Sequence, residues 1–258
     1  MAKPLFWTAT KGDQTVHLLG TIHMGVSADE LPASVWEAFA VSKQVAIEAN
    51  IQDLGLMASM LRKDKRTLQD ELGPATWGKL VALLGEKEAM GLTRFKTFVA
   101  TMRVQMHGLE ITPGVDIGVI ERANKSSKPL AYLEEGSLQM RLLEKWMTAG
   151  VVAAMIDNVG KLKSVNDGLV AAYRAGDEAA LLAIAEDDSS AASMGMTEKD
   201  ATQMEFEMLE QRNQSWIAPI EKLAAVGPAF IAVGAMHLVG DKSVVKMLEA
   251  RGWKVERQ

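Results

Sequence analysis

Two histidines stand in the same sequence context near opposite ends of the chain. Residues 16–25 read VHLLGTIHMG and residues 230–240 read FIAVGAMHLVG. Each segment has an apolar run, then Gly-x-x-His, then a further glycine, and a helical pattern follows. Glycine at a strand end permits a tight turn, which would deliver His23 or His237 to the rim of a sheet, where α/β proteins bind ligands. The repetition predicts that the two imidazoles meet at one site.

Acidic side chains close two further apolar runs. Glu48 ends the run VAIE and Glu134 ends the run AYLE, with Glu135 beside it. A buried carboxylate is costly unless it is paired, hydrogen-bonded or bound to metal. Carboxylates with neutral imidazoles suit zinc, manganese, cobalt or iron. An acid at the end of a strand can instead cap a following helix. A single histidine after a strand is more often structural, but the repetition of the Gly-x-x-His context favours a functional site.

Other polar residues carry weaker signals. His17 lies within the strand pattern before the first motif, and His107 lies near a helix end, where it suits the negative pole of the helix dipole. Arg212 and Asn213, followed by Trp216, lie towards the end of a helical run. Because a guanidinium group binds carboxylates bidentately, Arg212 is a candidate anion clamp. The sequence contains no HExxH, Gly-x-Ser-x-Gly, Walker or Gly-x-Gly-x-x-Gly motif.

The composition excludes several classes of function. The 258 residues include no cysteine, which excludes disulfides, a cysteine nucleophile and thiolate zinc sites. The net charge is -5, and no dense basic run is present, which argues against a nucleic-acid partner. No apolar stretch reaches the roughly 18 residues of a membrane span. The N-terminus lacks the features of a secretory signal. We therefore expect a cytoplasmic protein as the sequence stands, or a periplasmic or extracellular one if a leader was removed; the pattern does not indicate an oligomeric state.

Short apolar strands alternate with helical patterns along the chain. A hairpin is expected from two β-prone runs around Gly12-Asp13. A helix that follows Ser27 and Asp29 is expected to run to about Ser42, with Pro32 in its first turn. Strands are expected at 5–10, 15–20, 44–49, 129–134, 229–234 and 253–256. Further helices are expected within 54–108, 113–124, 137–225 and 243–251. This order predicts a mixed α/β fold, in which a sheet built from the duplicated strand-GxxH-helix unit is covered by many helices.

Five blocks together resemble the TraB/GumN family, which is related to the TIKI proteases and more remotely to erythromycin esterases and the ChaN haem-binding proteins. The blocks are PLFWTATKGDQTVHLLGTIHMG, VAIEAN, GVDIGVIERANKSSKPLAYLEEGSLQ, LEQRNQSWIAPI and FIAVGAMHLVGDKSVVKMLEARGWKVE. They cover nearly the whole length, so we expect one domain over 1–258 with a helical insertion at about 137–225. One departure is Glu134-Glu135, where the family commonly has Glu-Thr. The recurring positions are His23, Glu48, Asp116, Glu134, Gln139, Arg212, Asn213, Trp216 and His237.

The resemblance implies a metal-dependent hydrolase, most directly a peptidase. The expected metal is manganese or cobalt, with zinc as a further option, and its ligands would be His23, His237, Glu48 and Glu134. If Glu48 is not a ligand, it would accept a proton from the metal-activated water. Arg212 would bind a substrate carboxylate or stabilise an oxyanion. The residues expected to carry catalysis are Glu48, Arg212, His23 and His237, and those expected to bind substrate are Arg212, Asn213 and Asp116.

Two alternatives use the same residues differently. In the first, Glu48 and His23 activate water without a metal and hydrolyse an ester. In the second, the protein binds haem or a signalling peptide and catalyses nothing, with Tyr132 or a histidine on the iron and methionine-rich helices as the apolar walls. The expected partner is accordingly a peptide or a small molecule.

Overall fold

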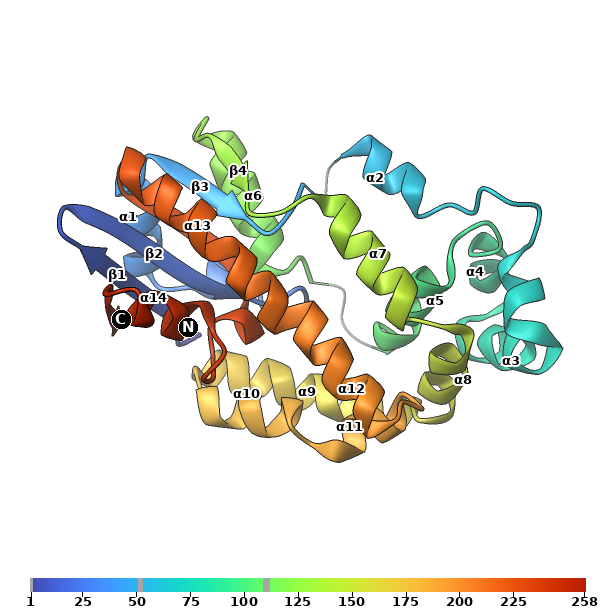
Figure 1. Ribbon diagram of the computed structural model, residues 1–258. Coiled ribbons are helices and arrows are strands. Elements are labelled where there is room, and N and C mark those ends of the chain that lie inside the picture. Colours follow the sequence, from blue (N-terminus) through green and yellow to red (C-terminus); the bar gives the residue numbers. More distant parts are fainter. Residues whose placement is uncertain (1, 51–52, 109–111) are drawn as a thin grey trace.

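A computed structural model of the chain describes residues 2–50, 53–108 and 112–258, apart from the side chains of 188–190 (Figure 1). Its centre is a six-stranded sheet with the order β4-β3-β5-β2-β1-β6. The strands are β1 Phe6–Lys11, β2 Gln14–Thr21, β3 Gln44–Ile47, β4 Leu130–Tyr132, β5 Ala229–Gly234 and β6 Lys254–Arg257. In the described part of the chain, β1 is antiparallel to both of its neighbours, β2 and β6, and the other neighbouring strands pair in parallel. The predicted mixed α/β fold and the opening hairpin are confirmed.

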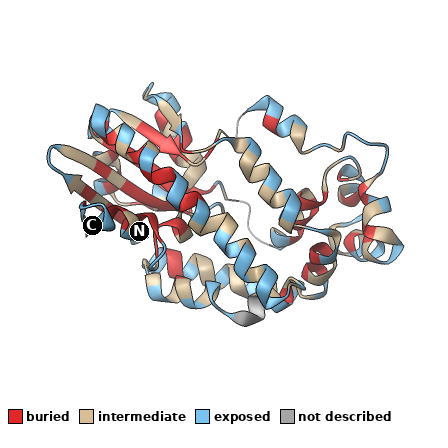
Figure 2. Ribbon diagram, in the orientation of Figure 1, coloured by how far each residue is buried: buried red, intermediate tan, exposed pale blue. Residues whose placement is uncertain are grey.

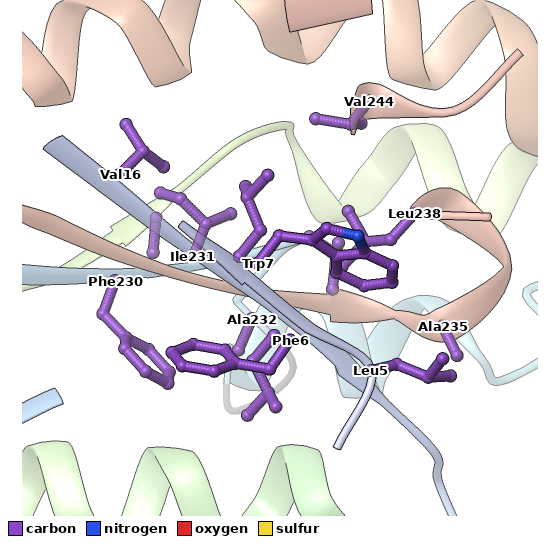
Figure 3. Close-up of a cluster of buried hydrophobic side chains, with 14 of the residues drawn as sticks. Leu5, Phe6, Trp7, Val16, Phe230, Ile231, Ala232, Ala235, Leu238 and Val244 are labelled. Atoms are coloured by element: carbon purple, nitrogen blue, oxygen red, sulfur yellow. The ribbon is translucent and has the colours of Figure 1, made fainter. Parts of the chain in front are cut away.

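Helices cover both faces of this sheet, which explains why its central strand is apolar throughout. The helices α1 (Ala33–Val41) and α6 (Val115–Lys125) lie on one face, and α13 (Gln211–Val226) lies on the other with α14 (Val244–Ala250) beside it (Figure 1). Alternate residues of β5 therefore meet different layers. Phe230 packs with Phe6 and with Phe39 of α1, whereas Ile231 lies on the side of Trp7 (Figure 3). Burial of each such side chain contributes about 1.5–3 kcal/mol.

The segment before α1 differs from the prediction, in which a helix follows Ser27 and Asp29 and has Pro32 in its first turn. The chain makes a 3-10 turn at Ala28–Glu30, capped by Ser27, and α1 begins only at Ala33. The cause is Pro32, because the residue before a proline is disfavoured in the helical region. Leu31 is extended, with ψ 145°, and the first turn ends there. The helix that was predicted to end near Ser42 is confirmed, but its predicted start before Pro32 was wrong.

A second core lies apart from the sheet and is entirely helical. It is formed by α3 (Leu68–Leu84), α4 (Glu86–Gly91), α5 (Thr97–Gln105) and α8 (Ala149–Asp157), and its buried residues include Leu80. The short helix α2 (Leu54–Ser59) precedes it in the chain. Figure 2 shows the buried residues of this lobe as a separate group from those of the sheet.

The predicted helical segment 137–225 is divided between the two cores. Its elements are α7 Gly136–Trp146, α8, α9 Val159–Ala175, α10 Glu178–Ala185, α11 Asp188–Ser193, α12 Glu198–Glu205, a π-helical turn Phe206–Glu210, and α13. Whereas α8 joins the helical core, α9 and α10 return to the sheet, where Tyr173 and Leu181 are buried. Within the described residues, no helix is both long enough and apolar enough to cross a membrane.

Candidate active site

The two Gly-x-x-His motifs lie next to each other, at the same end of neighbouring parallel strands. In the register of β2 with β5, Thr21 is opposite Gly234. The N–H of Gly234 donates to Oε1 of Glu48 at 2.8 Å, and a Cβ at Gly234 would lie 3.3 Å from that oxygen. Glycine therefore leaves the space that the carboxylate of the adjacent strand β3 occupies. The pairing of β2 with β5 thus brings the two Gly-x-x-His loops to the same end of the sheet as Glu48.

His237 is the buried member of the site. Its Nδ1 lies 2.6 Å from Oδ1 of Asn213, and its ring is tilted against Trp216 with centroids 4.4 Å apart. Because the amide oxygen only accepts, Nδ1 carries the hydrogen and the lone pair is on Nε2. Burial, together with the charge of Arg212, lowers the pKa of His237 to about 4, although Glu48 opposes this change. The ring is neutral at pH 7.

Arg212 lies at the centre of the site and uses all five of its N–H donors. Nε donates to Glu134, and Nη2 donates to Oε2 of Glu48 at 2.6 Å and to Oε1 of Glu134 at 2.7 Å. Nη1 donates to the carbonyl of Met208 at 2.9 Å and faces Nε2 of His237 at 3.2 Å. A guanidinium group has five such donors. In this arrangement Arg212 therefore has none left for a substrate carboxylate, the role that the sequence suggested.

The two strand-end carboxylates are both held by Arg212, but they differ in their other partners. Glu134 also accepts from Trp216 Nε1 at 3.0 Å, and its side chain is 4% exposed. Glu48 also accepts from Gln139 Nε2 at 3.0 Å. Burial acts to raise the pKa of Glu48, yet that pKa falls to about 2, because His237, which is protonated at such acidic pH, Arg212 and the Gly234 N–H stabilise the carboxylate. Glu48 is thus a weak proton acceptor.

His23 has the opposite environment to His237. Its side chain is 76% exposed, and its Nδ1 lies 3.2 Å from Oδ2 of Asp116. This hydrogen bond raises the pKa of His23, against the opposing effect of desolvation. Glu48 and Arg212 are near enough to influence that pKa as well. The imidazole of His23 is therefore exposed, and its pKa is raised above the ordinary value.

Asp116 reaches His23 because the first turn of α6 packs directly on the first histidine loop. The N–H of Val115 donates to the carbonyl of Ile22 at 3.0 Å. A Cβ at Gly114 would lie 2.3 Å from the carbonyl oxygen of His23, so only glycine allows this contact. The other oxygen of Asp116, Oδ1, is buried without a hydrogen-bond partner. The residue that the sequence suggested for substrate binding thus orients an imidazole.

Comparison with known proteins supports the pattern of this site. The model of the TraB/PrgY/gumN family matches residues 5–257. The chain belongs to that family. No curated protein and no solved structure matches the chain. The TraB/PrgY/gumN match spans both Gly-x-x-His motifs and the arginine block, so the resemblance read from the five sequence blocks is confirmed.

The four residues expected as metal ligands fit a metal in chemical type but not in position. Arg212 lies among Glu48, Glu134 and His237 and engages all three. Within the described residues, no group of three or more histidine or acidic side chains is arranged to hold a metal ion. Glu134 in particular has both oxygens engaged by Arg212 and Trp216.

Several contacts of this TraB/PrgY/gumN site were not predicted. The phenol of Tyr173 on α9 donates to the carbonyl of Gly20 at 2.7 Å. Sequence comparison had placed Gln139 and Trp216 on recurring positions, but it gave neither a role. His17 pairs with Thr8 at 3.1 Å, away from the cluster. The contacts of Tyr173, Gln139 and Trp216 within the site join residues more than 80 positions apart, so no local pattern carries their signal.

The two buried titrating groups predict instability in acid. The folded pKa of His237 is about 4, below the ordinary 6.5, and that of Glu48 is about 2, below the ordinary 4.5. In both cases the unfolded chain binds protons first, so stability is present above the ordinary pKa and falls as the pH drops. We expect the melting temperature to fall from pH 6.5 to 4 through His237, and further towards pH 2 through Glu48.

Circular dichroism melts across this range would test the expectation. The variant His237→Gln should flatten the upper part of the curve, whereas His107→Gln, at an exposed position, should leave it unchanged. A melting temperature of the unmodified protein that is constant from pH 6.5 to 4 would contradict the assignment of a neutral buried ring.

Proposed function

We propose that the chain is a hydrolase of peptides or esters in which His23 transfers the proton between water and substrate. The observation that carries this proposal is an exposed imidazole, held by Asp116, on the loop after β2, the strand that pairs with β5, whose Gly234 N–H binds Glu48. A general base must reach both water and substrate, and its pKa should lie near the working pH. Of Glu48, His237 and His23, only His23 is exposed, and its pKa is raised, whereas the pKa values of Glu48 and His237 are lowered.

The two groups on which the alternatives depend are less suited to accept the proton. Glu48 has a pKa of about 2 and is hydrogen-bonded to Arg212, Gln139 and Gly234. His237 is buried, and its Nε2 faces Arg212. We propose that Glu48, His237 and Arg212 are positioning residues. They hold together the end of the sheet that packs against the His23 loop. Asp116 orients His23, so that Nε2 is the atom that takes the proton.

Replacing Asp116 with asparagine is expected to shift the pH dependence of hydrolysis. Because the hydrogen bond from Asp116 raises the pKa of His23, its loss lowers that pKa. The acid limb of kcat/KM, which requires neutral His23, should then move to lower pH. The measurement is a pH profile of kcat/KM for Asp116→Asn, with Asp29→Asn, an exposed acid, as the control. A limb that stays in place would contradict the role of His23 as the base.

The activity itself is tested with a panel of fluorogenic peptides and p-nitrophenyl esters. Turnover must appear with at least one class and be lost in His23→Asn. Hydrolysis of no member of the panel, or equal hydrolysis by both proteins, would refute the proposal. The class that is turned over separates the peptidase from the esterase.

A divalent-metal hydrolase is the second candidate function. The hydrogen bonds that hold the imidazole rings of His23 and His237 favour it. The Nδ1 atoms of His23 and His237 face the oxygens of Asp116 and Asn213, as metal-binding imidazoles commonly do. Manganese, cobalt or zinc would be held by these rings with Glu48, and Arg212 would have to move. Calorimetric titration with each ion tests this. Binding lost in both His23→Ala and His237→Ala supports the metal, and equal binding by all three proteins argues against it.

A further inference from the structure

A methionine-rich cavity lies among α10, α11, α12, the π-helical turn before α13 and the loop after β5. Its volume is about 890 Å³, within the range of pockets that hold small molecules. In Figure 1 the surrounding helices α10, α11 and α12 gather below the start of α13. The methionines that line it are Met194, Met196, Met204, Met208 and Met236. Methionine side chains are flexible and polarisable, so such a wall adapts to an apolar ligand.

The mouth of the cavity is strongly acidic. Among the described residues that line it, Lys242 is the one cation, and it lies 3.0 Å from Glu210. The carboxylates of the lining are Glu186, Asp187, Glu198, Glu205, Glu210 and Asp241. Six negative charges against one positive charge favour a cation and repel an anion.

Among its described residues, the lining offers few neutral hydrogen-bonding side chains to a ligand. Its neutral hydrogen-bonding side chains are Thr202, which donates to the carbonyl of Glu198, and Asn213, which is engaged by His237 and by the carbonyl of Lys242. The walls are largely helical, so most of their backbone groups are already paired. The carboxylates only accept hydrogen bonds, so the many acceptors of a sugar, a nucleotide or an extended peptide would find few donors among the described residues of the lining.

We propose that this cavity binds a lipophilic cation, a molecule with a bulky apolar body and a single amine or quaternary ammonium head. The apolar body lies among the methionines, and the head lies among the carboxylates of the mouth. Phe206, which is partly exposed at the start of the π-helical turn, offers a ring face for the head. This site is separate from the proposed hydrolytic residues, and its occupation does not depend on catalysis.

The cavity nevertheless touches the machinery of the candidate active site. Met208 lies in the π-helical turn, a type of distortion that is frequent at functional sites, and its carbonyl accepts from Arg212. Asn213 also lines the cavity, and its side-chain oxygen accepts a hydrogen bond from Nδ1 of His237.

The test is calorimetric titration of the whole protein with three probes that share one chain: octyltrimethylammonium, octanol and octyl sulfate. We expect one site for the ammonium probe, with an affinity at least about tenfold higher than that for the sulfate, and octanol in between. Equal binding of the three probes, or no binding of the ammonium probe, would overturn the proposal.

Two variants locate the binding. Ala201→Trp fills the cavity from α12 and should abolish binding of all three probes. The double variant Glu186→Lys/Glu205→Lys leaves the apolar wall intact and should remove or reverse the preference for the ammonium probe. The matched control Glu37→Lys, at an exposed position on α1, should bind as the unmodified protein does. If Ala201→Trp does not fold, the double variant decides, and an unchanged preference for the ammonium probe in it would refute the assignment.

Discussion

Replacing Arg212 with methionine is expected to destabilise the fold by about 3–5 kcal/mol. The guanidinium group, whose side chain is 7% exposed, forms ion pairs with both Glu48 and Glu134. Without it, two carboxylates remain close together with little access to water, and the buried lone pair of His237 loses its donor. The measurement is the free energy of unfolding from urea denaturation at pH 7.

The control for this prediction is Arg251→Met, which breaks an exposed ion pair with Glu221. Exposed pairs contribute about 0–1 kcal/mol, so this variant should unfold almost as the unmodified protein does. Adding Glu134→Gln to Arg212→Met should recover part of the loss, because one buried charge is removed. A loss in Arg212→Met no larger than that in Arg251→Met would show that Arg212 does not hold the cluster together.

Replacing His23 with asparagine is expected to lower kcat/KM about 10²–10⁴-fold, the usual contribution of a positioned acid–base group. The melting temperature should stay almost constant, because the ring is exposed and its one hydrogen bond is to Asp116. This separation of activity from stability distinguishes His23 from Arg212, whose loss should affect both.

The matched control is His107→Asn, since His107 is also exposed but follows α5 in the helical lobe. It should retain full activity. A smaller variant, His23→Ala, adds a second readout: added imidazole should restore part of the rate if the ring itself carries the proton. An active His23→Asn variant with an unchanged pH profile would contradict the proposed role.

The sheet and the meeting of its key residues could be predicted because local patterns determine them. The runs VHLLG and FIAVG have the length and apolar character of buried strands, and each is punctuated by a glycine before its histidine. Parallel strands end at the same edge, so Glu48, the acid after a third apolar run, had to lie near both motifs.

The roles within the site could not be predicted, because they depend on contacts between distant residues. The sequence around Arg212 does not indicate that its guanidinium group donates to Glu48 and Glu134, which lie 164 and 78 positions away. The difference between an exposed His23 and a buried His237 is equally invisible in two nearly identical motifs. It arises because Asn213 and Trp216 of α13 cover only the second ring.

The place of β5 in the strand order has a consequence for how the protein forms during translation. The strand β5 (Ala229–Gly234) lies between β2 and β3 in the sheet. Until β5 has been synthesised, β2 and β3 have no strand that pairs with both of them. A nascent chain that stops before residue 229 therefore carries open strand edges, which are prone to aggregate. Chaperone binding to ribosome-held fragments should persist until this strand emerges, and then fall in one step.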